Sequence, residues 1–85
     1  MQDKIIKAVG SKLDDLSLRI DSVIYEKENN VNYLRIALDA DFIIDVNTVS
    51  KASKIIDPII DELDLINDAY ILDIYAKEKG DVLNG

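Results

Sequence analysis

Carboxylates are the reactive side chains that this sequence offers, because it contains no cysteine and no histidine. Without these two residue types, most pairs of a nucleophile and its base are absent, and so are most transition-metal sites. What remains is carboxylate chemistry, either in acid–base pairs or in sites for a hard cation. The positions of the acids therefore decide what the chain could do.

One group of acids is superficially similar to a calcium or magnesium loop: Asp39, Asp41 and Asp45. An EF-hand loop needs oxygen ligands at alternate positions, followed by a glycine. Here Ile43 takes the third ligand position and Ile44 takes the glycine position. We therefore expect a loop that ends in a helix N-cap at Asp45, with no metal, no cofactor and no catalytic residue.

A second group of acids follows the predicted second helix and its exit. Its members are Asp57, Asp61, Glu62, Asp64 and Asp68, with Asp73 further along the chain. A run of charges is most often the solvated face of a helix. The alternative is a surface that binds Lys and Arg side chains of a partner. These six residues are our candidates for partner binding.

Composition favours a protein partner over a nucleic acid. The 85 residues suit one domain, 48% of them are hydrophobic, and 17 acidic against 10 basic residues give a net charge of −7. Such a charge opposes binding to phosphate backbones and attracts basic proteins. The cations Arg19, Arg35, Lys51 and Lys54 are scattered, so we expect RNA binding to be weak at most. The four tyrosines could stack on bases, but strand tyrosines more often cover the edges of a core.

The sequence also indicates a compartment. The absence of cysteine gives no sign of an oxidising environment. No apolar run approaches the ~20 residues of a membrane span, and the first residues lack the pattern of a signal peptide. We expect a soluble cytoplasmic protein that does not act at a membrane.

Hydrophobic spacing predicts five elements that position these residues: a helix over 3–16, strands over 18–25 and 33–39, a helix over 46–63 and a strand over 70–75. Apolar residues recur every three or four positions in the helices: Ile5, Ile6, Val9, Leu13 and Leu16, then Val46, Val49, Ala52, Ile56, Ile59 or Ile60 and Leu63. Pro58 predicts either two helices or one kinked helix, and we favour the second because the apolar phase continues across it.

The first two strands are predicted to form a hairpin around Glu28-Asn29-Asn30, because asparagine tolerates the left-handed backbone of a tight turn. Leu34, Ile36 and Leu38 should face the core. Ile20 and Val23 break the alternation of the first strand, which indicates a bulge or burial of both faces.

The expected fold is α+β, a two-layer α/β sandwich in α-β-β-α-β order, with two helices on one face of a three-stranded sheet. The last helix is a crossover, so the third strand should run parallel to the second; whether it lies beside the first or the second strand stays open. We expect one domain over 1–76 and a flexible tail over 77–85.

Two regions, residues 34–54 and 63–74, resemble the N-terminal domain of the bacterial ribosome maturation factor RimP family. Residues 34–39 (LRIALD) and 44–54 (IDVNTVSKASK) are similar to its Leu-Arg-Val-x-Ile-Asp strand and Ile-Asp-Leu-Asp-Asp-Cys helix start. Residues 63–74 (LDLINDAYILDI) are similar to its segment of the type Asp-Pro-Ile-x-x-x-Tyr-x-Leu-Asp-Val. The resemblance covers nearly the whole chain, from the first helix to Ile74.

The chain departs from the family pattern after the last strand. The family has Ser-Ser-Pro-Gly there, followed by a basic stretch and an SH3-like barrel, whereas residues 75–80 read YAKEKG and the sequence ends at Gly85. We expect a fragment or a short relative without the barrel.

The resemblance implies a non-enzymatic factor in maturation of the small ribosomal subunit. Its implied partners are the assembling subunit and a strongly basic small-subunit ribosomal protein, numbered twelve. Two alternatives stay open: a small KH-like RNA-binding domain, although no Gly-x-x-Gly loop occurs, and a homo-oligomer formed through exposed Phe42, Ile43 or Ile71.

Overall fold

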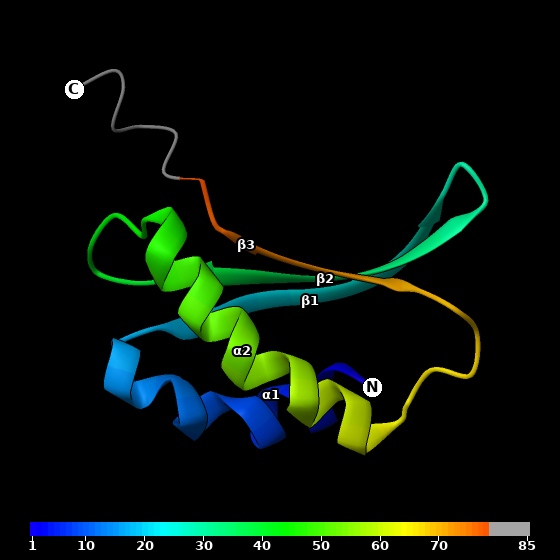
Figure 1. Cartoon of the computed structure of the whole chain (residues 1–85), viewed down its shortest axis with the longest axis horizontal. Coiled ribbons are helices and arrows are strands. Elements are labelled where there is room, and N and C mark those ends of the chain that lie inside the picture. Colours follow the sequence, from blue (N-terminus) through cyan, green and yellow to red (C-terminus); the bar gives the residue numbers. More distant parts are fainter. Residues whose placement is uncertain (79–85) are drawn as a thin grey trace.

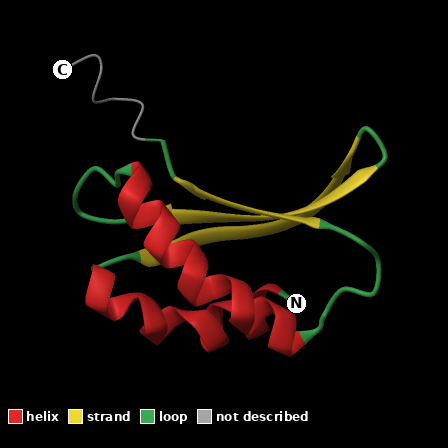
Figure 2. Cartoon of the chain, in the orientation of Figure 1, coloured by secondary structure: helices red, strands yellow, loops and turns green. Residues whose placement is uncertain are grey.

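The computed structural model describes residues 1–78 as two helical segments packed on one face of a mixed three-stranded sheet (Figures 1 and 2). The elements are α1 (Gln2–Val9), the 3-10 helix η1 (Gly10–Leu16), β1 (Arg19–Glu28), β2 (Val31–Asp39), α2 (Val46–Leu63) and β3 (Ile71–Ala76). The predicted α+β sandwich and its α-β-β-α-β order are confirmed. Most of the predicted tail lies outside the described residues.

The strand order is β1-β2-β3, which places β2 in the centre of the sheet. β1 pairs with β2 antiparallel, and β3 pairs with β2 parallel, as a helical crossover predicts. The question that the sequence left open is thereby answered, since β3 lies beside β2. We call the sheet face that packs on the helices the inner face and the opposite one the outer face.

The hairpin between β1 and β2 is longer than predicted. Its turn consists of Asn29 and Asn30, both in the left-handed region with φ of 52° and 66°, and Glu28 pairs with Val31 across it. Two left-handed residues make the turn type that matches the twist of a two-residue hairpin. The strands therefore continue through polar residues to the turn, and the hairpin projects beyond the helices (Figure 2).

The predicted bulge in the first strand is present. The register of β1 against β2 shifts between Ile20 and Ser22, so Asp21 is the extra residue. This shift returns Ile20 and Val23 to the inner face, opposite Leu38 and Ile36. β1 is also an edge strand, and its Val23 carbonyl accepts a hydrogen bond of 2.9 Å from the side-chain amide of Gln2.

The prediction of one continuous first helix is wrong. The α-helix ends at Val9 and a 3-10 helix continues to Leu16. Gly10 lowers the preference for α-helix at this point, and the three-residue period of η1 keeps Leu13 and Leu16 on one side. Ile6, predicted to be in the buried stripe, is 42% exposed, since Ile5 and Val9 take the inward positions.

The second helix has the predicted bounds and runs through Pro58. Asp45 caps it, because its Oδ1 accepts a hydrogen bond of 2.8 Å from the backbone amide of Thr48. Val46 was predicted to belong to the apolar stripe, but it is 83% exposed. The first buried residue of α2 is Ala52, so the first turn of this helix contributes no buried side chain.

The core lies between the helices and the inner face of the sheet. Leu34, Ile36 and Leu38 of β2 are fully buried there, as predicted. Ile56 of α2 and Leu13 of η1 are also fully buried.

No helix within residues 1–78 is long and apolar enough to span a bilayer.

The cap of α2 should make the free energy of unfolding depend on pH in the acidic range. The hydrogen bond from Thr48 lowers the pKa of Asp45 below its ordinary value of 3.8. The stabilisation is therefore present above the unfolded pKa and is lost as pH falls through the lower folded pKa. We expect Asp45→Asn, which keeps a capping oxygen, to weaken this acid dependence, and Asp45→Ala to lower the urea midpoint at every pH. Equal pH profiles for wild type and Asp45→Asn would contradict the assignment.

Replacing Pro58 should stabilise the domain. Proline inside a helix removes one backbone hydrogen bond, and Pro58 is exposed, so its ring contributes little to the core. We expect Pro58→Ala to raise the free energy of unfolding by roughly 1–3 kcal/mol in urea titrations. Ile56→Ala, two residues earlier but fully buried, should instead lower it by about 2–5 kcal/mol.

Candidate protein-binding surface

The C-terminal part of α2 presents Asp57, Asp61 and Asp64 on one side. Their spacings of four and three residues place successive side chains next to each other on a helix. Ile56 and Ile60, each the residue before an acid, are buried and fix the rotation of the helix. As a result the three acids lie beside the buried stripe and are exposed to solvent.

The charge at this end of α2 is not compensated by any side chain within residues 1–78. Within residues 1–78, Asp57, Asp61, Glu62 and Asp64 make no side-chain hydrogen bond and no ion pair. The last turn contains no basic residue. Negative charge at a helix C-terminus is unfavourable by about 0.3–1 kcal/mol, because the helix dipole is negative there. These carboxylates therefore reduce helix stability and are available to donors on another molecule.

Tyr70 lies within the electrostatic influence of the acids at the end of α2. Burial raises the pKa of its phenol, and the negative charges of Asp61, Asp57 and Asp64 raise it further. Tyr70 lies just before β3 and is half-buried. The three carboxylates therefore act on the same hydroxyl group, which lies just before β3.

Asp68 extends this surface toward the hairpin. It lines a surface hollow of about 550 Å³, together with Lys27, residues 30–32 and residues 69–71. The side-chain amide of Asn32 donates a hydrogen bond of 3.2 Å to the carbonyl of Ala69 across this hollow. This hydrogen bond links the hairpin to the loop before β3.

Asp73 does not belong to the same surface. In the register of β3 against β2 it lies beside Arg35, on the outer face. The six acids that the sequence grouped as partner-binding candidates are thus divided by the sheet. Five lie at the end of α2 and in the following loop, and Asp73 lies on the opposite side of the domain.

Arg35 occupies the centre of the outer face. Its guanidinium lies 3.4 Å from Glu26, 3.4 Å from Glu28 and 3.7 Å from Asp73, and 4.4 Å above the ring of Tyr33. Its Nε is buried and has no hydrogen-bond partner. One cation thus holds three carboxylates from β1 and β3, at distances longer than a good charge-assisted hydrogen bond.

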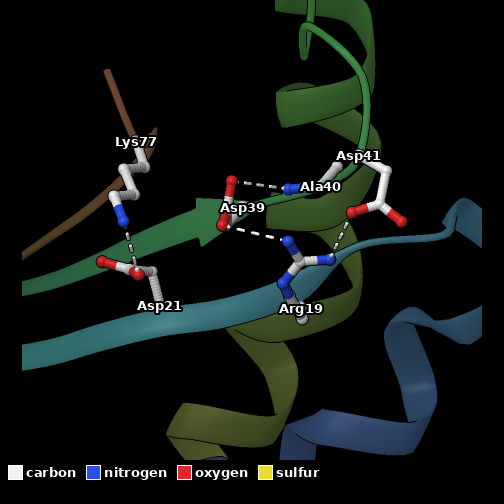
Figure 3. Close-up of polar contacts among 6 residues, drawn as sticks. All are labelled: Arg19, Asp21, Asp39, Ala40, Asp41 and Lys77. Carbon is white, nitrogen blue, oxygen red and sulfur yellow. Dashed lines mark hydrogen bonds and ion pairs between the residues drawn. The ribbon is translucent and has the colours of Figure 1, made fainter. Parts of the chain in front are cut away.

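A second set of ion pairs fixes the other end of the sheet. Arg19 binds Asp39 at 3.1 Å and Asp41 at 3.3 Å, and Lys77 binds Asp21 at 3.2 Å (Figure 3). Asp39 also accepts a hydrogen bond of 2.9 Å from the backbone amide of Ala40. These contacts connect β1 with β2 and with the residue that follows β3.

The acids of the calcium-like loop therefore serve structural contacts. Asp39 and Asp41 bind Arg19, whereas Asp45 caps α2. No group of three or more potential metal ligands occurs in the part of the chain that the structure describes.

Sequence reasoning missed the role of Arg35, which it treated as one of several scattered cations. The signal was present in the alternation of β2, because Tyr33 and Arg35 are two residues apart and must share a face. The partners Glu26, Glu28 and Asp73 needed the strand order and the length of the hairpin, which periodicity does not give.

Comparison with known protein families places this geometry in a described domain family. The family model described as the RimP N-terminal domain matches residues 8–76. The match starts within α1 and ends with the last residue of β3, so it includes the acidic end of α2 and the centre of the outer face.

The arrangement around Tyr70 predicts a coupled titration. Replacing Asp61 with asparagine removes the largest of the charge effects that raise the pKa of Tyr70, so this pKa should fall toward its ordinary value of 10. The phenol carbon resonance of Tyr70, followed by NMR at alkaline pH, measures the change. Asp3→Asn alters the charge equally, but on α1, and should leave the Tyr70 midpoint unchanged. The same shift in both variants would contradict the arrangement.

Proposed function

This chain belongs to the RimP family of ribosome maturation factors, because it matches the N-terminal domain of that family, and we propose that it acts as a non-enzymatic binding module in maturation of the small ribosomal subunit. We place this role in the cytoplasm, where ribosomal subunits assemble. The module contributes a charged surface on a rigid scaffold, and binding rather than catalysis is its task.

The proposed partner is the strongly basic small-subunit ribosomal protein numbered twelve. The observation that carries this proposal is the uncompensated negative charge of Asp57, Asp61, Glu62 and Asp64 at the end of α2. These exposed carboxylates have no ion-pair partner among residues 1–78, so they can receive Lys or Arg without breaking an existing pair. Their field also steers a cationic protein toward the domain.

Direct RNA binding is the weaker candidate. The net charge of −7 repels phosphates, and the sequence has no Gly-x-x-Gly segment to hold a nucleotide backbone. Association of two copies is the other alternative. Phe42, Ile43 and Ile71 are exposed, as predicted, and a homo-oligomer formed through them stays a prediction.

Neutralising the α2 acids should weaken binding of the basic protein. We expect the triple variant Asp57→Asn, Asp61→Asn, Asp64→Asn to lose about tenfold in affinity at low salt, since three exposed pairs of about 0.5 kcal/mol each are removed. Calorimetric titration with the purified ribosomal protein measures this loss. The loss should shrink as salt is added, because salt screens exposed charges.

A matched control separates the location of the charge from its amount. Asp3, Asp14 and Asp15 are exposed on α1 and η1, and replacing all three with asparagine changes the net charge by the same three units. This control should change the affinity by less than about twofold. Equal losses of affinity in both triple variants would show that only the net charge matters, and would contradict a specific surface on α2. Absence of saturable binding by the wild-type chain would reject the proposed partner.

A further inference from the structure

The outer face of the sheet exposes apolar side chains that the helices do not cover. Strand alternation and register place Ile24, Val31, Ile71 and Tyr75 on this face, and they are 43%, 37%, 50% and 38% exposed. Ala37 of β2 lies on the same face, between Ser22 and Tyr75, and is buried. Exposed apolar groups that share one sheet face are characteristic of an interaction surface.

Charge determines what can cover this face. Its ion pairs join three cations, Arg19, Arg35 and Lys77, to six carboxylates, which leaves a formal excess of three negative charges. The distances around Arg35 are 3.4–3.7 Å, so each carboxylate keeps lone pairs for a further donor. The face is therefore complementary to a cationic occupant with apolar side chains.

A second copy of this chain fits poorly. A two-fold symmetric dimer brings the same patch of both subunits together. Two outer faces would then oppose each other with three excess negative charges each, and like charges across an interface are unfavourable. Nucleic acid is repelled by the same charge.

We propose that the outer face is a second docking surface, and that its occupant is a segment of a basic protein in which Lys or Arg alternate with apolar side chains. The cations extend the network around Arg35, and the apolar side chains cover Ile24 and Ile71. This inference rests on the proposed function, since it assigns a second contact to the same basic ribosomal protein. The two surfaces lie on opposite sides of the sheet, so the partner reaches both only by extending around the edge of the domain.

Isoleucine methyl NMR on the full, unmodified chain tests the proposal directly. Ile24 and Ile71 report on the outer face, Ile59 and Ile60 on α2, and the exposed Ile43 on the loop before α2. With the purified ribosomal protein twelve as the probe, the Ile24 and Ile71 methyls should shift along a saturable curve, and Ile43 should not shift. Shifts confined to α2 would overturn the outer-face proposal and leave the proposed function standing, whereas no shift anywhere would overturn both.

Two pairs of substitutions provide a second test of the outer-face proposal. Ile24→Ser with Ile71→Ser should weaken binding about tenfold, as the loss of two interface contacts predicts. Ile43→Ser with Val46→Ser removes equally apolar side chains from residues that are 74% and 83% exposed, and should change affinity less than about twofold. Equal effects of the two pairs would overturn the proposal, and so would sedimentation showing that wild type dimerises and that Ile24→Ser with Ile71→Ser abolishes the dimer.

Discussion

Burial of one face of β2 is the constraint on which this domain depends. Leu34, Ile36 and Leu38 are all fully buried in the central strand, so the strand has no stable arrangement without helices over that face. A strand of this kind needs neighbours on both sides to satisfy its backbone groups, and β1 and β3 supply them. The helices, the crossover and the mixed sheet follow from covering and pairing this one strand.

The same constraint distributes the charge. With every fully buried position apolar, the acids must lie on the outside of the helical layer or on the outer face of the sheet. On the sheet they meet Arg19, Arg35 and Lys77 and are held in ion pairs. At the end of α2 they meet no cation among the described residues and remain uncompensated. The domain thus presents two negative surfaces, and only one of them is restrained by its own cations.

Local spacing was sufficient where the buried residues of an element recur at a constant interval. It predicted the inward side of β2 because Leu34, Ile36 and Leu38 alternate along the strand, and it predicted the start of α2 from the capping residue Asp45. It failed at Gly10, where the helix period changes, and at Val46, where the helix extends past its buried part. Strand order and the separation of Asp73 from the α2 acids depend on contacts between distant segments, which local spacing does not encode.

The hydrogen bond from Gln2 to Val23 has a consequence for behaviour at high concentration. An edge strand offers unpaired main-chain groups that can recruit a strand from a neighbouring molecule and so begin polymerisation. On β1 one such acceptor is already in use, and the bulge at Asp21 distorts the ladder two residues earlier. A single amide side chain at the start of the first helix thus occupies an acceptor through which the open edge of this sheet could otherwise recruit a further strand.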